Sequence, residues 1–509
     1  MPAFTSSFFL HPSRRRPLAA GVAALFAVSA NSAWATPPAV TNCNDSGMGS
    51  LRYAVDPANG AVSGDTIDLS GLTPGDPGCG GGPVSTVSTI TLTTGAIVIP
   101  VGGDQTKLGV LTIKGPGQDA LLIQQSPGSN SRVIQHNYYN GLASRSHLYL
   151  ENLTVGYAHI SSSKTANGGC VASTWGTVTL TNVHVKDCSA STTAAPYSGY
   201  RALGGGVFAQ YGLTLVNSSI SNSGAYAVLT GVRARGGCAQ TPDNLDMRDS
   251  VVARCKAVGP IGDIYVRGGA LEAHGNVTIT GSVIANSYTS NYAGGIAIIS
   301  GPAYTMTISN SSIAYNQGYE MVGGVFAYAG HVNINNSTIV HNTAGNHTYT
   351  QNAKQYNRAP GVSIYSLSGN FSLQSSIIAN NTANGTQEDL SFGASTGLTF
   401  AASNNLVRAY LSDVTLPGGQ GNLAQGTCPL LGHARNNGGH TYTAAPQSGS
   451  PVIDAGNNTA NDPHTGAPAL YDQRGIGFPR VSGPSADIGA HEVQKTDIVF
   501  NSEFETGCE

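Results

Sequence analysis

Alternating apolar residues followed by a small polar residue recur along the chain between residues 148 and 381. In each copy the first and third positions are apolar, and the fifth is asparagine or a small polar stand-in. The eight copies begin at Leu148, Val178, Leu213, Leu245, Val277, Met306, Val332 and Phe371. They follow one another about every 32 residues, a period that is typical of a stacked repeat architecture.

Two further features keep a steady offset from this strand phrase. Most copies are preceded by a glycine pair that opens a short apolar run, such as Gly236-Gly237, and several are followed by an asparagine. Each period therefore predicts three short strands separated by bends. The expected fold class is all-β, a right-handed parallel β-helix from about residue 85 to 410 with a loop-rich C-terminal segment. The hand follows the general preference of β-crossovers.

Asparagines at the fifth position of the phrase are predicted to be structural. Amide side chains at equivalent bends can bond along the axis of the stack and form a ladder, as in cross-β assemblies. The residues concerned are Asn152, Asn182, Asn217, Asn310 and Asn336.

The N-terminus predicts a secretion signal. Arg14-Arg15-Arg16 precedes an apolar stretch from Leu18 to Ala30, and Ala33-Trp34-Ala35 offers a small-x-small cleavage site. The mature chain is expected outside the cell or on a bacterial cell surface, as a monomer without a transmembrane helix. The expected divisions are 1–35 for the signal peptide, 36–135 for an N-terminal cap and first coils, 136–410 for the repeats, and 411–509 for the C-terminal segment and tail.

Eight cysteines, an even number in an exported chain, predict disulfides. Their order favours local pairs, the middle two of which each close within one coil and would contribute about 3 kcal/mol. Zinc is the alternative, but no Cys-x-x-Cys or nearby histidine spacing supports it. The expected pairs are Cys43–Cys79, Cys170–Cys188, Cys238–Cys255 and Cys428–Cys508.

Composition limits the class of partner. Charged residues make up 10% of the chain, the net charge is −3 and the isoelectric point is near 6.5. Because no sustained basic run is present, nucleic acid is not expected as a partner. A polar but weakly charged surface suits polysaccharides or cell-surface proteins better.

Both ends of the chain resemble secreted bacterial β-helix proteins. The segment Cys43-Asn-Asp-Ser-Gly-Met-Gly-Ser50-Leu51-Arg52-Tyr-Ala54 is similar to a Cys-Ser-Leu-Arg-Glu-Ala motif, although Tyr53 replaces the glutamate and the cysteine lies seven residues before Ser50. A C-terminal series resembles the choice-of-anchor Q domain. Its members are Asn436-Asn-Gly-Gly-His440, Ser450-Pro-Val-Ile-Asp454-Ala-Gly456, Asp472-Gln-Arg474-Gly, Pro479-Arg480 and Asp487-Ile-Gly-Ala-His491-Glu492. The resemblance implies an exported protein with a pectin-lyase-like β-helix, and it implies no particular activity.

Carboxylates, which a polysaccharide lyase or hydrolase would need, are sparse in the repeats. Five of the seven between residues 152 and 381 fall in two neighbouring coils, beside several arginines. Asp243, Asp246 and Asp263 are therefore the catalytic candidates. A salt-bridged surface patch is the structural alternative, and Asp249 is expected to be structural.

A stripe just before the glycine pairs provides the ligand-binding candidates. These are Arg201, Arg235, Arg267 and Arg358, with Tyr292 and Met321 in the intervening coils and Tyr265 in a neighbouring loop. Tyrosine offers an apolar face for a sugar ring and a hydroxyl for hydrogen bonding. The structural alternative is that these side chains cover loop backbones and apolar edges.

Four carboxylates in the C-terminal motifs are the metal candidates: Asp454, Asp472, Asp487 and Glu492. They could hold Ca²⁺ through oxygen ligands. The favoured interpretation is that they cap turns or pair with Arg474 and Arg480. No other cofactor is expected.

The functional hypothesis is a non-catalytic, adhesin-like protein that binds carbohydrate or a surface partner along one face of the solenoid. A polysaccharide lyase or glycoside hydrolase acting on an acidic polysaccharide is the first alternative. A structural envelope spacer is the second.

Overall fold

The computed structural model describes residues 37–80, 86–99, 109–136, 146–261, 265–345, 348–351, 354–365, 369–393, 398–410, 414–416 and 420–495. The chain divides into two units, Met1–Ala35 and Thr36–Glu509, of which only the second is described below. The expected signal peptide and the tail from residue 497 lie outside the described residues.

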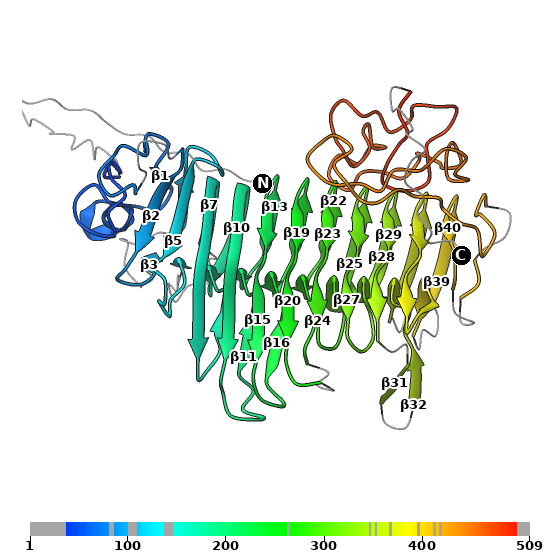
Figure 1. Ribbon diagram of the computed structural model, residues 1–509, viewed down its shortest axis with the longest axis horizontal. Coiled ribbons are helices and arrows are strands. Elements are labelled where there is room, and N and C mark those ends of the chain that lie inside the picture. Colours follow the sequence, from blue (N-terminus) through cyan, green and yellow to red (C-terminus); the bar gives the residue numbers. More distant parts are fainter. Residues whose placement is uncertain are drawn as a thin grey trace, which may run out of the picture. The chain divides into compact units, whose positions relative to one another are not determined.

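Parallel strands from successive coils stack on one another along the chain (Figure 1). A short helix, α1 (Leu51–Ala54), and a 3₁₀ turn, η1 (Pro57–Asn59), precede the coils. The predicted all-β, right-handed parallel β-helix is confirmed.

Four stacks make up the sides of the coils, and long strands run through more than one of them. The first, glycine-led stack contains β3 (Ile97–Ile99), β6 (Ile134–His136), β9 (Val171–Ser173), β12 (Val207–Ala209), β17 (Ala239–Thr241), β21 (Leu271–Ala273), β25 (Ile296–Ser309), β28 (Val325–Asn335), β33 (Val362–Ile364) and β38 (Leu390–Phe392). The second contains β1 (Asp65–Asp68), β4 (Val110–Lys114), β7 (Ser146–Ser162), β10 (Gly176–Thr192), β13 (Leu213–Val216), β18 (Leu245–Arg248), β22 (Val277–Thr280), β34 (Gly369–Gln374), β39 (Leu398–Ser403) and parts of β25 and β28.

The other two stacks follow the bends. The third contains β2 (Ser88–Leu92), β5 (Leu121–Gln125), β14 (Ser219–Ser221), β19 (Val251–Ala253), β23 (Val283–Ala285), β26 (Ser312–Ala314), β29 (Thr338–Val340), β35 (Ile377–Ala379), β40 (Leu406–Val407) and parts of β7 and β10. The fourth contains β15 (Gly224–Ala227), β20 (Lys256–Val258), β24 (Tyr288–Thr289), β27 (Gln317–Gly318), β30 (Thr343–Ala344), β36 (Thr382–Ala383), β37 (Thr386–Gln387) and the ends of β7 and β10. Outside them lie a three-stranded sheet of β8 (Ala166–Asn167), β11 (Arg201–Leu203) and β16 (Arg233–Arg235), and a hairpin of β31 (Thr348–Gln351) and β32 (Lys354–Asn357).

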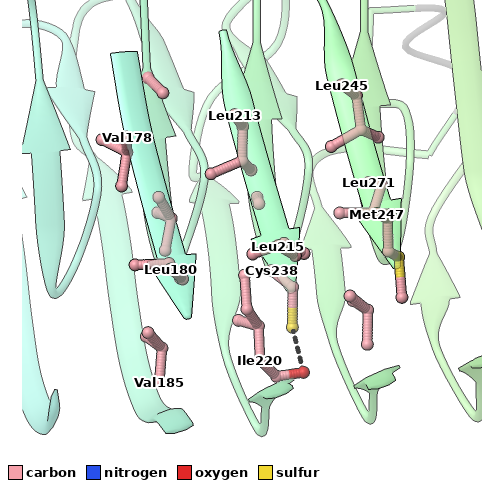
Figure 2. Close-up of a cluster of buried hydrophobic side chains, with 14 of the residues drawn as sticks. Val178, Leu180, Val185, Leu213, Leu215, Ile220, Cys238, Leu245, Met247 and Leu271 are labelled. Atoms are coloured by element: carbon pink, nitrogen blue, oxygen red, sulfur yellow. Dashed lines mark hydrogen bonds between the residues drawn. The ribbon is translucent and has the colours of Figure 1, made fainter. Parts of the chain in front are cut away.

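The strand phrases of the sequence lie in register in the second stack. Leu148 pairs with Val178, Val178 with Leu213, and Leu213 with Leu245, and the series continues to Phe371. The first and third positions of every phrase are buried, because alternation turns them into the coil. Figure 2 shows these aligned side chains meeting residues of the first and third stacks inside the coils. Each buried aliphatic side chain contributes about 1.5–3 kcal/mol.

The fifth position of each phrase marks a bend, but it does not build the predicted amide ladder. Residues there have φ between 45° and 61°, a left-handed conformation that asparagine and glycine tolerate best. Asn182 Nδ2 does donate to Asn152 Oδ1 at 2.7 Å. Asn310, however, donates to the Tyr471 carbonyl, and the Asn336 side chain has no hydrogen-bond partner among the described residues. Backbone conformation therefore accounts for asparagine at these bends better than a ladder does.

The amide ladder lies one bend further on, inside the coils. Asn342 Oδ1 accepts from the backbone and side-chain N–H groups of Asn316, at 3.0 Å each. Asn381 Oδ1 does the same for Asn342, at 2.9 Å each, and Asp389 Oδ1 continues the series with Asn381. All four residues are buried, so the ladder satisfies backbone groups that the bend leaves without strand partners.

Two of the predicted disulfides, Cys170–Cys188 and Cys238–Cys255, occupy the same corner of the coil in earlier turns. Cys43–Cys79, Cys170–Cys188 and Cys238–Cys255 are all formed. Cys428 is disulfide-bonded, but its expected partner Cys508 lies outside the described residues. In the later coils an asparagine stands at the position of the second cysteine of a disulfide. A glycine then stands at the position of the first cysteine. A Cβ at Gly324 would lie 3.1 Å from Asn342 Nδ2, so the ladder amide fills the space of the missing side chain.

Stability is predicted to fall with rising pH because of Asp389, at the end of the ladder. Burial raises its pKa to about 7, against hydrogen bonds that lower it. The unfolded state, with the ordinary pKa of 3.8, therefore loses this proton first. The contribution of this proton to the free energy of unfolding is fully present below pH 4 and is lost as pH rises through 7. The loss is on the order of 1 kcal/mol per pH unit. Urea unfolding between pH 5 and 8 should show the difference in unfolding free energy between wild type and Asp389→Asn decreasing with pH. A constant difference would contradict this.

The loop-rich C-terminal segment packs on the outward side of the third stack. Leu431, Val452 and Ile488 form a second core with apolar residues of β26, β29, β35 and β40. Ser312 Oγ donates to Gln473 Oε1 at 2.5 Å, and the Ala490 N–H donates to Thr338 Oγ1 at 3.0 Å. The segment thus packs on the later coils of this stack, and Figure 1 shows its backbone beside them.

Candidate functional site

A cleft of about 450 Å³ lies on the third stack, next to the part that the C-terminal segment covers. Its residues come from four successive coils, from the loop before β5 and from the C-terminal segment. They are Gln118, His184, Asn217, Ser218, Ser219, Ser221, Asp249, Val251, Ala253, Arg254, Val283, Ala285, Asn286, His440 and Tyr442.

The floor of the cleft consists of the outward side chains of β14, β19 and β23. Because alternation sends the middle residue of each strand into the core, the first and third face outward. Serines occupy these positions in β14, whereas β19 and β23 contribute Val251, Ala253, Val283 and Ala285. The floor therefore changes from hydroxyl-bearing to apolar over three strands, spaced about 4.8 Å apart.

The two bends that flank these strands carry the polar rim. Asn217 and Asp249 stand at one bend, and Arg254 and Asn286 at the other, all with left-handed φ. Arg254 Nε donates to Asn222 Oδ1 at 2.9 Å, which holds its guanidinium along the rim. The same backbone requirement that selects polar residues at the bends thus places donors and acceptors on both sides of an apolar floor.

The C-terminal segment contributes one end of the cleft through His440 and Tyr442. Between them, Thr441 is buried and accepts a 2.9 Å hydrogen bond from Gln473 Nε2, which also donates to the Tyr442 carbonyl. This anchor leaves the flanking side chains outside the core, and the Tyr442 side chain is 60% exposed.

Two titratable groups in the cleft have perturbed pKa values. Burial raises the pKa of Asp249, against the opposing effect of nearby His440. Burial also lowers the pKa of His184, whose Nε2 lies 2.9 Å from Ser221 Oγ. Near neutral pH the cleft therefore presents a neutral imidazole as a hydrogen-bonding group.

The catalytic candidates from the sequence do not line this cleft. Asp246 accepts from Arg248 Nη2 at 2.5 Å and is 2.8 Å from Nε2 of His464, in the C-terminal segment. Asp243 lies in the turn before β18, where its carboxylate accepts the Asn244 N–H. Asp263 lies outside the described residues. For Asp246 these contacts match the salt-bridged patch that was the structural alternative.

The predicted arginine stripe forms in part, and most of it is covered. Arg235, Arg267 and Tyr292 are bridged in register, but Arg201 pairs with Arg233, two residues before Arg235. The offset arises because three glycines, beginning at Gly204, follow β11 where two were assumed.

Burial further limits what the stripe can contact. Arg235, Tyr292 and Arg358 are buried, as is Met321. The Arg358 guanidinium lies 5.1 Å from the Phe326 ring centre and 5.0 Å from that of Tyr365. Tyr265 remains exposed, next to Arg233. A continuous open stripe from Arg201 to Arg358 is therefore not available to a ligand.

The four metal candidates have other polar partners, and the Asp454 carboxylate accepts the Ser485 N–H at 3.4 Å. Asp472 binds Arg474 Nη2 at 2.7 Å, and Asp487 accepts the backbone N–H groups of Asp454 and Val493. Glu492 accepts two backbone N–H groups and lies 3.5 Å from Arg480. The described residues hold no group of three or more histidine, cysteine or acidic side chains arranged for a metal ion. The Ca²⁺ hypothesis stays a prediction.

Sequence reasoning missed the cleft because its residues come from several coils and a distant segment. His184 showed no spacing that singled it out, and Asp249 was assigned to a bend, where it does lie. The Asn436–His440 motif was the one available signal, since it brings His440 and Tyr442 to the site.

The fold and the cleft define a parallel β-helix protein with a lateral site bounded by its own C-terminal segment. No family model matches the chain, so the choice-of-anchor Q resemblance gains no support, and no curated protein matches it. Among solved structures, pectate lyase Pel9A is similar at 14% identity and a TM-score of 0.34, over 87% of this chain and 91% of that chain. At this low TM-score the assignment of the fold rests on the strand registers above.

Proposed function

We propose that this protein is an exported, non-catalytic β-helix that binds carbohydrate in the cleft. The observation that carries the proposal is an apolar floor between two polar rims, repeated along the axis of the stack. A sugar ring offers both an apolar face and a circle of hydroxyl groups, so it matches such a surface. A linear glycan could place successive sugars over successive coils.

The balance of charges in the cleft favours a neutral glycan. Arg254 and Asp249 contribute one charge of each sign, while Asn217, Asn286 and His184 offer hydrogen bonds without net charge. Tyr442 adds an exposed ring at the end of the cleft, where a sugar can stack.

A place outside the cytoplasm is part of this proposal. Three disulfides among the described residues suit an oxidising compartment, and they support secretion or display on the cell surface. No helix in the described part of the chain is long and apolar enough to cross a membrane.

A polysaccharide hydrolase or lyase is the second candidate, because Asp249 and two histidines line the same cleft. The raised pKa of Asp249 would suit a general acid. Glycosidases, however, usually need two carboxylates facing the scissile bond, and Asp249 is the one carboxylate among the lining residues. This difference favours binding over catalysis.

Tyr442→Ala is expected to weaken binding of a neutral polysaccharide by about tenfold, since ring stacking at an exposed site contributes roughly 1 kcal/mol or more. Affinity electrophoresis and calorimetry with a panel of neutral and acidic polysaccharides would measure this. Tyr304→Ala removes another part-exposed tyrosine far from the cleft and should have no effect.

The same panel separates the three functions. Release of reducing ends or unsaturated sugars that disappears in Asp249→Asn would establish an enzyme. If both tyrosine variants bind the polysaccharide equally well, the cleft is not the binding site. No binding to any polysaccharide would favour the envelope spacer.

A further inference from the structure

A cluster of arginines lies outside the cleft, on the small sheet formed by β8, β11 and β16. β11 and β16 pair in parallel, with Arg201 beside Arg233. Arg235 follows two residues after Arg233 and is bridged to Arg267 in the next coil. Figure 1 shows β11 and β16 at the lower edge of the coils.

Strand geometry arranges these four side chains as a staggered array over three coils, with Arg201 in the first, Arg233 and Arg235 in the second and Arg267 in the third. Residues two apart on a strand project to the same side, about 6.8 Å apart, and neighbouring strands are about 4.8 Å apart. Ala202 and Ala234 point to the opposite side, where they are buried in a small apolar core with Val232 and Val266. The alanines thus fix which face of the sheet the arginines occupy.

The four arginines of the array lie near one buried carboxylate of the described residues, Glu272. Glu272 is fully buried and lies 3.2 Å from Arg235 Nη1 and 2.6 Å from His274 Nε2. Burial lowers the pKa values of Arg201, Arg233 and Arg267, and repulsion from Arg235 lowers them further.

Donors of Arg201, Arg233 and Arg235 have no acceptor among the described residues. The guanidinium groups of Arg201 and Arg233 make no hydrogen bond or ion pair within the described residues. Arg235 is only 6% exposed, yet its Nε has no partner among them. Arg201 and Arg233 are only partly buried, so their N–H groups remain accessible to a ligand that accepts hydrogen bonds.

Aromatic side chains stand beside the array on the same stacked loops. The Arg233 guanidinium lies 4.6 Å from the centre of the Tyr265 ring, and Tyr265 is 36% exposed. Tyr197 is 79% exposed and Tyr200 is 38% exposed, one loop earlier. Anion acceptors and sugar-stacking rings therefore occur within one surface.

We propose that the array of Arg201, Arg233, Arg235 and Arg267 is an anion-binding site for the carboxylate or sulfate groups of an acidic polysaccharide. Guanidinium groups bind such groups through paired, charge-assisted hydrogen bonds. The neighbouring tyrosines hold the sugar rings that carry them. The site is separate from the cleft, and the proposal does not depend on binding there.

The test uses one polysaccharide in an uncharged and two negatively charged forms: dextran, carboxymethyl-dextran and dextran sulfate. The full chain is expected to bind the two charged polymers at least tenfold more tightly than dextran. Arg201→Gln/Arg233→Gln should lose at least tenfold of that affinity, because two charge-assisted contacts are removed. Lys114→Gln/Lys495→Gln removes the same charge elsewhere and should bind like wild type. Circular dichroism and urea unfolding would show that each variant is folded.

Three results would overturn the proposal. The first is an equal loss of affinity for the charged polymers in the arginine and lysine variants, which would indicate a diffuse charge effect. The second is binding of inorganic sulfate without binding of the polymers, and the third is equal binding of polyglutamate, which would indicate an acidic peptide. Tyr442→Ala distinguishes the two sites, because it should weaken neutral-glycan binding and leave dextran sulfate binding unchanged. The proposal for each site can therefore be refuted without the other.

Discussion

Asn342→Ala is expected to destabilise the protein by about 3–5 kcal/mol. The substitution removes the acceptor of two Asn316 N–H groups and the donor to Asn381 Oδ1 and to the Ile313 carbonyl. These groups are buried, so water does not replace the lost partners, and each orphaned group costs about 1–3 kcal/mol. Equilibrium unfolding in urea would measure the change in the free energy of unfolding.

Asn333→Ala provides the matched control for the ladder. Asn333 lies in the same coil and faces outward, with one long contact of 3.5 Å to Thr307 Oγ1. Its removal should change stability by no more than about 0.5 kcal/mol. Asn342→Ser should be intermediate, because Ser287 already fills this place two coils earlier, where it accepts the Cys255 N–H. Similar losses for the two alanine variants would show that the ladder contributes nothing particular.

Arg474→Ala is expected to destabilise the C-terminal segment by about 3–5 kcal/mol and to abolish binding in the cleft. The Arg474 side chain is fully buried and binds Asp472 through Nε and Nη2. It also donates to the Asn437 and Glu492 carbonyls. Removing one partner leaves the Asp472 carboxylate buried and uncompensated. Because Asn437 leads into His440 and Tyr442, the end of the cleft should be lost with it.

Limited proteolysis, urea unfolding and glycan binding would be measured on Arg474→Ala together with Arg435→Ala. Arg435 is an exposed arginine of the same segment with a side-chain hydrogen bond to Asn437, and its loss should change all three far less than the loss of Arg474. The double variant Asp472→Ala/Arg474→Ala should be less destabilised than the sum of the single variants, since it removes both charges. Equal protease resistance of Arg474→Ala and wild type would show that the ion pair does not hold the segment in place.

The sequence predicted the coils well because their determinant is local. Alternation such as Leu213–Leu215 and Leu245–Met247 decides which side chains face inward, and a constant period brings them into register. The disulfides followed from the same periodicity, since Cys238 and Cys255 lie at two corners of one coil.

The sequence predicted the ladder at the wrong bend, for a physical reason. Asn310 and Asn316 belong to the same coil. Asn310 suits its position because it tolerates a left-handed backbone, whereas Asn316 suits its position because its side-chain amide forms the ladder. A sequence does not distinguish these two uses of asparagine. Only the direction of each side chain, into or out of the coil, separates them.

What the sequence by itself determined is therefore the repeating coil, its buried positions and its cross-links, all of which depend on contacts at a fixed spacing. Tertiary structure alone decided the sites. The cleft exists because the C-terminal segment packs over β26, β29, β35 and β40 and ends beside β23, where Thr441 contacts the Gly281 carbonyl, which brings His440 within the same cleft as Asp249. The arginine array exists because Arg201 pairs with Arg233 and not with Arg235. Both depend on the docking of irregular segments, whose lengths follow no period, and burial then determines which of their charged side chains remain accessible.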